Sequence, residues 1–382
     1  MKCAVLRERH PGETRVAASP DMVKRLKNQG VAVAIEAGAG ESAGWTDDTF
    51  REAGAIVSAD AADVLTGADV VFKVGRPVVT DDVDELALIP EGCIVVGLIN
   101  PLVDRKQYAG YAARRLTVLA MELIPRISRA QSMDALTSQA SLAGYKAVLD
   151  ACIFFGRAMP MMMTAAGTIA PARVLVLGAG VAGLQAIATA RRLGAVVEAF
   201  DVRAAVKEEV ESLGATFVEV PGAGDAETRE GYAREMDDAY LVRQGEVIAS
   251  ALKKTDICIT TARIPGRPAP RLVTAAMVQD MKPGSVIVDL AVEDGGNCDS
   301  SRCGEVVEAG GVAIVGFANV AGRLAADAST FYARNLFNLI TPFIDTSAGR
   351  LALDHTDEVI NGMCVMRDGL LVHPLLCDTK EC

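Results

Sequence analysis

The fold is decided by one stretch, RVLVLGAGVAGLQAIATARRLGAVVEAFDVR, which spans residues 173–203. An apolar run at residues 174–177 is long enough for a buried strand and too short for a helix. A Gly-x-Gly-x-x-Gly turn follows at once, and residues 184–193 have the pattern of a helix. A second apolar run at residues 195–200 ends on Asp201. This order of strand, glycine turn, helix, strand and acid is the full context that a dinucleotide-binding turn requires.

Each glycine of the turn has its own physical role. Gly178 lets the chain turn tightly, Gly180 lets the backbone approach a pyrophosphate, and Gly183 lets the helix pack closely on the strand. The phosphates would then bind unpaired N–H groups at the positive end of the helix. Asp201, 18 residues after Gly183, can accept both ribose hydroxyls of NAD and repel the 2′-phosphate of NADP. Arg203 leaves this preference open, because an arginine there can stack on adenine or bind a 2′-phosphate.

The composition is that of a folded protein that does not bind nucleic acid. The 382 residues are 51% hydrophobic and 23% charged, and this length allows two or three domains with large cores. Acidic residues outnumber basic ones by 49 to 38, whereas phosphate contacts need clustered Lys and Arg. The nine cysteines are scattered and form no CxxC motif, which predicts reduced thiols and no metal site.

We expect neither a signal peptide nor a membrane span. The first apolar residues meet charges at Arg7 and Glu8, unlike the long apolar core of a signal peptide. The longest uncharged run, residues 174–190, contains the three glycines of the turn. It is also shorter than the about 20 lipid-compatible residues that a transmembrane helix needs.

Strands alternate with helices along the chain, which predicts an α/β protein with parallel, doubly wound sheets. Buried strands are expected at residues 2–6, 31–36, 68–74, 93–98, 116–120, 255–261, 284–290 and 312–315. A helix from about residue 321 to 339 would return the chain to its first domain. We predict two Rossmann-like domains joined by long helices, with an NAD cleft between them. They are a discontinuous N-terminal domain of residues 1–135 plus 330–382 and an NAD(H)-binding domain of residues 136–329.

Residues 121–170 connect the two predicted domains. Residues 125–131 are polar and irregular, and from Ser132 onward apolar residues recur at helical spacing. A loop and a long helix between two domains lie where a cleft should form. We interpret the methionine-rich residues 160–167 as core filler. Residues 222–238 are interpreted as a long surface loop, either a lid or a disordered connector.

The polar residues allow two kinds of chemistry. An enzyme that oxidises an alcohol or an amine needs a general acid–base group near the nicotinamide, most often histidine. His10, His355 and His373 all lie near the chain termini, and only for His10, in a loop, does this role stay open. Arg15 and Lys73 could hold a substrate carboxylate or, equally, form an ion pair between domains.

Hydride exchange between two nicotinamides is different, because no proton is exchanged and the protein only has to position the rings. A cleft lined by polar groups that are poor bases at neutral pH would serve this purpose. The candidates are Arg126, Gln131, Asp134, Thr137 and Ser138. The simpler interpretation of these residues is a solvated helix start.

Six blocks of the chain, running nearly from end to end, resemble one family. They are RISRAQSMDALTSQASLAGYKAV, PMMMTAAGT, VLGAGVAGLQAIATARRLGA, TARIPGRPAP, MKPGSVIVDLAVEDGGNC and CVMRDGLLVHP. All are similar to domain I, the NAD(H)-binding component of proton-translocating NAD(P) transhydrogenase. The chain looks like the split form of that enzyme, in which domain I is a separate subunit. Alanine dehydrogenase and saccharopine dehydrogenase share segments similar to RVAASP and KVGRP of this chain.

The resemblance implies a homodimer that is peripheral at the cytoplasmic face of the inner membrane and binds NAD(H) on its second Rossmann-like domain. Hydride would pass directly to NADP bound by a partner subunit, coupled to proton movement through a membrane-spanning subunit. Arg126, Gln131 and Asp134 match the loop that holds the nicotinamide end, and Gly231 and Tyr232 match a mobile loop that closes over the adenosine. The other expected cofactor-binding residues are Thr137, Ser138, Gly178, Ala179, Gly180, Val181, Gly183, Asp201, Val202, Arg203 and Ala262.

Two alternatives stay open. Arg15 and Lys73 match the substrate-carboxylate positions of alanine dehydrogenase, which would make the chain a stand-alone NAD-dependent amino-acid dehydrogenase. However, residues 97–102, GLINPL, contain no histidine where that enzyme has its acid–base residue, and this favours transhydrogenase. The second alternative is a non-catalytic NADH sensor, whose nucleotide binding would be indifferent to Gln131→Asn.

Overall fold

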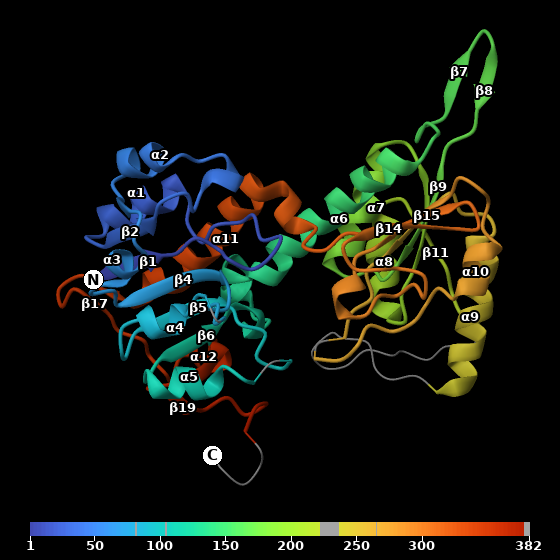
Figure 1. The fold of residues 1–382 in the computed structure, drawn as a ribbon. Helices are drawn as coiled ribbons and strands as arrows, with labels where there is room; N and C mark the ends of the chain where they lie inside the picture. Colours follow the sequence, from blue (N-terminus) through green and yellow to red (C-terminus); the bar gives the residue numbers. More distant parts are fainter. Residues whose placement is uncertain (81, 104, 222–236, 265, 378–382) are drawn as a thin grey trace. The chain divides into compact units, whose positions relative to one another are not determined.

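The computed structural model describes residues 1–80, 82–103, 105–221, 237–264 and 266–377 (Figure 1). The chain divides into two compact units. Unit 1 consists of Met1–Gln139 with Gly322–Cys382, and unit 2 of Ala140–Ala321. Unit 1 therefore contains both ends of the chain; it divides from unit 2 after residue 139 and before residue 322, where the sequence predicts 135 and 330.

Unit 1 is built on an eight-stranded sheet in the order β19-β18-β6-β5-β4-β1-β2-β3. Six neighbouring strands are parallel, as the alternation of strands and helices predicts: β1 (Lys2–Val5), β2 (Ala32–Glu36), β3 (Ile56–Ser58), β4 (Val70–Gly75), β5 (Ile94–Leu98) and β6 (Thr117–Ala120). At the β6 edge, β18 (Cys364–Arg367) and β19 (Leu370–Leu371) add antiparallel strands from the end of the chain. A separate antiparallel pair is formed by β16 (Ile344–Asp345) and β17 (Arg350–Leu351).

Helices cover both faces of this sheet, and each strand fills two cores because successive side chains point to opposite faces. On one face, Phe72 of β4 packs in a cluster with α1 (Pro20–Asn28), α2 (Asp47–Ala53), α11 (Ala325–Ile340) and α12 (Glu358–Met363). On the other face, Val71 packs with α3 (Ala61–Leu65), α4 (Glu85–Leu88) and α5 (Tyr108–Ala113). The 3₁₀ turns of the unit are η1 (Glu41–Ala43), η2 (Met121–Leu123), η3 (Ser128–Met133), η6 (Ala321–Leu324) and η7 (Thr341–Phe343).

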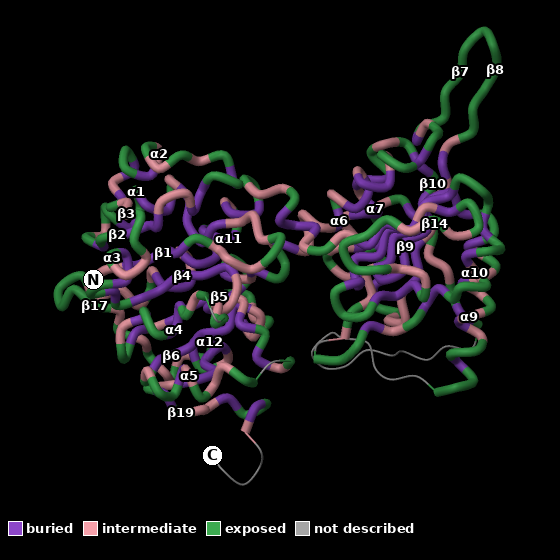
Figure 2. Tube along the Cα trace, viewed as in Figure 1, coloured by how far each residue is buried: buried purple, intermediate pink, exposed green. Residues whose placement is uncertain are grey.

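Unit 2 is built on a seven-stranded sheet in the order β11-β10-β9-β12-β13-β15-β14. The parallel strands are β9 (Arg173–Leu177), β10 (Val196–Phe200), β11 (Thr216–Phe217), β12 (Ile257–Thr260), β13 (Val286–Asp289) and β15 (Val312–Gly316). The edge strand β14 (Glu305–Ala309) is antiparallel. The prediction of two Rossmann-like α/β folds with parallel sheets is confirmed, and Figure 2 shows both sheets as the buried centres of their units.

The helices of unit 2 also form two layers. One cluster joins Val176 of β9 to α7 (Val181–Arg192), α8 (Lys207–Ser212) and α6 (Ala135–Phe154), a helix that begins in unit 1 and continues into unit 2. The opposite cluster joins Leu177 to α9 (Asp238–Leu252) and α10 (Ala275–Gln279). The remaining 3₁₀ turns are η4 (Ala204–Val206) and η5 (Val292–Asp294). The glycine turn thus connects the carboxyl end of β9 directly to the start of α7.

The methionine-rich segment is not core filler, so that prediction is wrong. It forms a hairpin of β7 (Met162–Thr164) and β8 (Gly167–Ile169) that extends from unit 2 (Figure 1). Met161, Met162 and Met163 are all exposed. A two-stranded hairpin without a packed layer cannot bury either of its faces, and Figure 2 shows it exposed along its length.

Three further expectations can be compared with the structure. Within the described ranges, no helix is long and apolar enough to cross a membrane, and no group of three or more His, Cys, Asp or Glu side chains could hold a metal ion. Seven cysteines are free thiols, but Cys377 is disulfide-bonded, so the prediction of reduced thiols is wrong at that position. Residues 222–236 of the predicted loop, with Gly231 and Tyr232, lie outside the described residues.

Candidate nucleotide-binding site

The glycine turn of unit 2 has the geometry that its sequence predicts. Gly178 has a φ of 101°, a left-handed conformation that favours glycine. A Cβ on Gly183 would lie 1.8 Å from the carbonyl oxygen of Gly178, so only glycine lets α7 approach the strand this closely. A Cβ on Gly180 would meet only the Arg203 Nη2 atom, at 4.0 Å. The backbone at Gly180 is therefore open, as the approach of a pyrophosphate requires.

Two contacts that the sequence did not predict support this turn: a hydrogen bond from Thr261 and the close packing of α6 at Gly144. Thr261, directly after β12, donates its hydroxyl to the carbonyl of Gly178 over 2.9 Å. Gly144 lets α6 pack against the start of α7, because a Cβ there would lie 2.0 Å from the carbonyl oxygen of Ala182. A threonine after one strand and a glycine inside a long helix carry no sequence pattern that links them to residues 178–183. Their role follows only from the packing.

Asp201 lies where the sequence places it, directly after β10. Its Oδ2 accepts the backbone N–H of Ala179 at 2.7 Å, which ties the acid to the glycine turn. Arg203 closes on the same carboxylate, with Nε 3.0 Å from Oδ1 and Nη2 2.9 Å from Oδ2. The neighbouring Tyr240 has a raised pKa, first because it is buried and then because the Asp201 carboxylate lies near it. Arg203 is thus paired with the acid.

Ala262 is held by a buried side chain that the sequence did not point to. Asn297 accepts the N–H of Ala262 at 3.0 Å and donates its amide to the carbonyl of Ala262 at 2.9 Å and to that of Pro270 at 2.8 Å. The backbone of Asn297 is in turn fixed by Asp289, whose Oδ2 accepts its N–H at 2.8 Å. Both backbone groups of Ala262 are hydrogen-bonded to Asn297, which fixes the shape of the loop after β12. Ala262 can therefore contribute to a nucleotide site through the shape of this loop.

The second predicted group of site residues belongs to unit 1, at the junction of η3 and α6. Asp134 caps α6: its Oδ1 accepts the N–H of Thr137 at 2.9 Å and its Oδ2 accepts the Thr137 hydroxyl at 2.6 Å. The helix therefore begins after Asp134 and not at Ser132. Ser138 donates its hydroxyl to Asn335 of α11 at 2.8 Å. Two of the predicted residues, Asp134 and Thr137, thus already have a structural role as a helix start.

Arg126 and Gln131 are exposed on the loop that leads to this helix, and the loop is anchored on both sides. Asn335 and Asn338 of α11 both donate to the carbonyl of Ser132 at 3.0 Å. Arg129 pairs with Asp357 at 2.8 Å, and this contact lowers the pKa of the Asp357 carboxyl. The loop therefore presents Arg126 and Gln131 from a fixed backbone.

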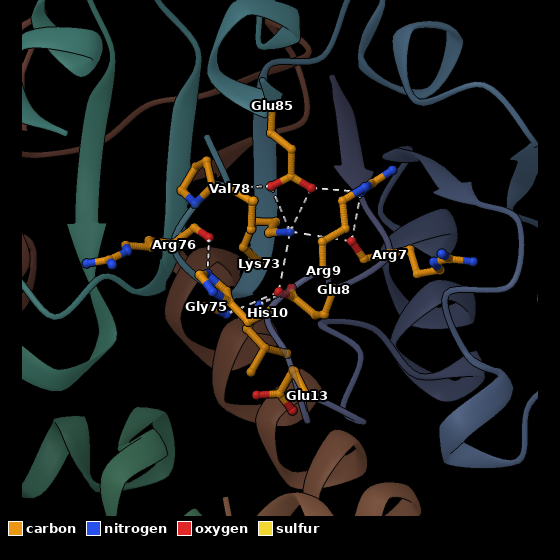
Figure 3. A network of polar contacts seen from close by, with 12 residues as sticks. Arg7, Glu8, Arg9, His10, Glu13, Lys73, Gly75, Arg76, Val78 and Glu85 are labelled. Atoms are coloured by element: carbon orange, nitrogen blue, oxygen red, sulfur yellow. Dashed lines mark hydrogen bonds and ion pairs between the residues drawn. The ribbon is translucent and has the colours of Figure 1, made fainter. Parts of the chain in front are cut away.

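Lys73 lies inside unit 1 at the centre of a network of charges (Figure 3). It is fully buried, and its Nζ lies 3.3 Å from Glu8 Oε2 and 3.1 Å from Glu85 Oε2. Arg9 bonds Glu85 at 2.7 Å and also pairs with Glu36. Burial raises the pKa of Glu8 while Lys73 lowers it. The sequence left open whether Lys73 binds a substrate carboxylate or an ion-pair partner, and its partners here are carboxylates of the same unit.

Arg15 is satisfied in the same way. Its Nε and Nη2 lie 2.8 and 2.7 Å from the two carboxylate oxygens of Glu13, and its Nη1 donates to Gln139 at 3.0 Å. Bidentate pairing of this kind is how an arginine binds a substrate carboxylate. Because Glu13 and Gln139 both belong to unit 1, the expectation of an ion pair between domains is wrong for Arg15, as it is for Lys73.

The three histidines all belong to unit 1. The rings of His10 and His373 lie at hydrogen-bonding distance from the carbonyls of Arg76 and Gly362, at 2.9 and 3.1 Å. Burial lowers the pKa of both His355 and His373. None of them belongs to the unit that contains the glycine turn.

The parallel sheet, the glycine turn and the acid after the second strand define an α/β dinucleotide-binding protein of the Rossmann type. The comparisons with known proteins agree with this class. Residues 4–143 match the family model described as the alanine dehydrogenase/PNT N-terminal domain, and residues 147–374 match the corresponding C-terminal domain. The chain belongs to the alanine dehydrogenase/PNT family and, within it, to the alpha subunits of NAD(P) transhydrogenase.

Three relatives illustrate the similarity. The first portion of the split NAD(P) transhydrogenase subunit alpha of Rhodospirillum rubrum is 55% identical over 98% of this chain and 99% of its own length. A crystal structure of transhydrogenase from Sinorhizobium meliloti is 49% identical, with a TM-score of 0.87 over 97% of this chain and all of that one. A structure of L-alanine dehydrogenase is 26% identical, with a TM-score of 0.79 over 98% of both chains.

Proposed function

We propose that the chain is the NAD(H)-binding subunit of a proton-translocating transhydrogenase and that it passes hydride directly between NADH and NADP on a partner subunit. One observation carries the choice over an amino-acid dehydrogenase. Both cations that could hold a substrate carboxylate, Arg15 and Lys73, are already paired with carboxylates of unit 1 whose side chains are at most 9% exposed. A substrate could take either cation only by leaving one of those carboxylates buried without its partner, which is strongly unfavourable.

The residues of unit 2 fit a dinucleotide. The open backbone at Gly180 would receive the pyrophosphate, with Ala179 and Val181 at the start of α7 and Gly183 holding that helix against the strand. Asp201 would bind the adenosine ribose, flanked by Val202 and Arg203, and Ala262 would line the site through the loop after β12. We also include Gly231 and Tyr232, which lie outside the described residues, on their resemblance alone.

Arg126, Gln131 and Asp134 would position the nicotinamide end, with Thr137 and Ser138 beside them. The bound nicotinamide supplies the hydride, so these side chains need only orient it and exclude water. The anchoring of the loop through Ser132 supports this role, because positioning requires a fixed backbone. Thr137 donates two short hydrogen bonds to Asp134, so both side chains are already engaged. This fits polar residues that line the site without giving or taking a proton in the reaction.

The proposal includes partners. The name of the Rhodospirillum rubrum relative describes one portion of an alpha subunit, which supports further subunits that carry the NADP site and the membrane span. We propose that this chain is a homodimer at the cytoplasmic face of the membrane. Proton movement would belong to the membrane component.

Deuterium transfer tests the proposed reaction. NADH labelled with deuterium at the transferred position of C4 would be mixed with NADP, the purified chain and membranes that contain the other transhydrogenase subunits of a relative. Direct transfer places the deuterium in NADPH without exchange with water, which mass spectrometry measures. Tight binding of NADH with no labelled NADPH would contradict the proposal, and membranes without the added chain are the control.

The two alternatives are tested on the same preparation. Steady production of NADH from alanine and NAD by the chain alone would favour an amino-acid dehydrogenase. For the NADH sensor, Gln131→Asn is informative, because shortening a positioning side chain by one methylene slows a hydride step by up to about 100-fold. The proposal predicts this slower step with nearly unchanged NADH affinity, whereas a sensor has no hydride step to slow.

A further inference from the structure

The carboxylate of Asp201 is fully hydrogen-bonded within unit 2. Its Oδ1 accepts the backbone N–H of Arg203 at 2.9 Å and the Nε of the same arginine at 3.0 Å. Its Oδ2 accepts the N–H of Ala179 at 2.7 Å and Arg203 Nη2 at 2.9 Å. A carboxylate offers about four lone-pair sites, and these donors use all of them. Two ribose hydroxyls therefore find no free acceptor on Asp201 while Arg203 holds it.

Local geometry explains why Arg203 can hold the acid so completely. Asp201 follows the last residue of β10, and Arg203 lies two positions later with an extended backbone, at the start of η4. Its N–H and its guanidinium can therefore both reach one carboxylate. The side chains of Arg203 and Asp201 are 16% and 7% exposed. A pair so shielded from water is held more firmly than a surface ion pair.

The guanidinium of Arg203 also lies beside the glycine turn. A Cβ on Gly180 would be 4.0 Å from Nη2, which is an ordinary van der Waals contact. Gly180 is the residue at which the backbone of such a turn approaches a pyrophosphate. If Arg203 left Asp201, its positive charge would stay close to where the phosphates bind.

We propose that Arg203 is an intramolecular competitor for the ribose position of the nucleotide. Binding exchanges the Arg203–Asp201 ion pair for hydrogen bonds from the ribose hydroxyls to Asp201, and the released guanidinium turns toward the phosphates. Arg203 thus sets the affinity for the adenosine half of the nucleotide and reduces the binding free energy that the ribose hydroxyls contribute. This inference rests on the proposed NAD(H) function and names the residue that tunes that site.

Calorimetric titration of the full chain with two probes tests the exchange. 5′-AMP carries both ribose hydroxyls, and 2′,3′-dideoxy-AMP carries neither. In Arg203→Met, which removes the guanidinium but keeps an apolar stem, the two ribose hydroxyls should contribute about tenfold more to affinity than in the wild type, as expected when an acceptor for a charge-assisted hydrogen bond is freed. The ratio of the two dissociation constants should widen by a similar factor, because the hydroxyls then meet an unshared carboxylate.

Arg173→Met is the matched control. It removes an arginine that pairs with Glu198 at 2.6 Å on the same sheet, at the opposite end of β9 from the glycine turn. Its affinity for 5′-AMP should equal that of the wild type. Arg203→Lys provides a second variant if the methionine variant does not fold. A lysine cannot form the paired contacts with both oxygens, so the ratio of the two dissociation constants should widen by about threefold.

The outcomes separate this inference from the proposed function. Unchanged or weaker 5′-AMP binding in the Arg203 variants, with an unchanged ratio between the probes, would show that Arg203 does not compete for Asp201. If the wild type binds NADH and 5′-AMP in that experiment, the proposed function survives and only the role of Arg203 is wrong. If the wild type binds neither nucleotide, the proposed function fails as well.

Discussion

Replacing Lys73 by methionine should destabilise unit 1 and make its stability strongly dependent on pH. The ammonium is completely buried and contacts Glu8 and Glu85 at 3.1–3.3 Å. Methionine has a similar length and keeps the apolar stem in place. After the change, Glu85 still bonds Arg9, whereas Glu8 keeps only its bonds from the N–H groups of Val74 and Gly75. The lost interaction therefore falls mainly on Glu8.

The expected magnitude follows from this imbalance of charge. Removing one partner of a buried ion pair costs about 3–5 kcal/mol, so the free energy of unfolding should fall by this amount at pH 8. Burial already raises the pKa of Glu8 in the folded state, and Lys73 opposes this rise. A carboxyl group with a raised folded pKa contributes stability at low pH and loses it as pH rises through that pKa. Without Lys73 the pKa rises further, so at pH 5 the loss should shrink by about 1.4 kcal/mol for each additional unit.

Urea denaturation of both proteins at pH 5 and pH 8 measures the effect. Trp45 is the only tryptophan and belongs to unit 1, so its fluorescence reports on this unit. Arg51→Met is the control, because its pair with Asp48 is largely exposed and should contribute no more than about 0.5 kcal/mol. Adding Glu8→Gln to Lys73→Met should restore much of the stability at pH 8. A loss under about 1 kcal/mol, or an equal loss at both pH values, would refute the reasoning.

Further predictions concern the glycine turn, its supporting loop and a second buried acid. Gly183→Ala should destabilise unit 2 by about 3 kcal/mol in urea denaturation, because its methyl group would overlap a carbonyl oxygen. Gly180→Ala should leave stability nearly unchanged and weaken NADH binding about tenfold in titration, because it obstructs only the approach of the pyrophosphate. Asn297→Ala removes three side-chain hydrogen bonds, so unfolding should cost about 3 kcal/mol less at about 1 kcal/mol for each bond, with weaker NADH binding. Burial raises the pKa of Glu122 from 4.5 to about 7, so its contribution to stability is present below pH 4.5 and lost as pH rises through 7. Glu122→Gln should therefore reduce the change in the free energy of unfolding between these pH values by about 1–3 kcal/mol, measured by Trp45 fluorescence.

The sequence predicted what depends on residues close together in the chain. Runs of apolar residues between polar turns place ten strands of the two sheets to within one or two residues, because a strand buried on both faces needs a short continuous apolar run. The strands that the sequence did not predict lie at or next to the sheet edges: β3, β11, β14, β18 and β19. The glycine turn was predictable for the same reason, since its three glycines lie within six consecutive residues between a strand and a helix. The acid after β10 follows from the length of one strand–helix–strand unit.

What the sequence did not predict depends on residues far apart in the chain. The hydroxyl that supports Gly178 comes from Thr261, 83 positions away, and the amide that holds Ala262 comes from Asn297, 35 positions away. A lysine in an apolar strand does require a buried carboxylate partner, so some partner for Lys73 could have been anticipated. Which acids supply it is decided by how the loop after β1 crosses β4, and no local pattern contains that information.

The cations of unit 1 and the Asp201–Arg203 pair of unit 2 differ in which groups would lose their partners when a ligand binds. A carboxylate that took Arg15 would displace Glu13, and one that took Lys73 would displace Glu8 or Glu85; the side chains of these three acids are 9%, 2% and 1% exposed. An uncompensated buried charge costs several kcal/mol, and an oxo acid brings no cation to offset it, whereas an amino acid brings one ammonium group. In the exchange that we propose for unit 2, a dinucleotide would bring two ribose hydroxyls that donate to Asp201 and phosphates that pair with Arg203, so both separated groups would find new hydrogen-bond partners. This difference, together with the missing histidine, is the physical reason to expect the chain to bind a nucleotide and to leave small acids unreacted.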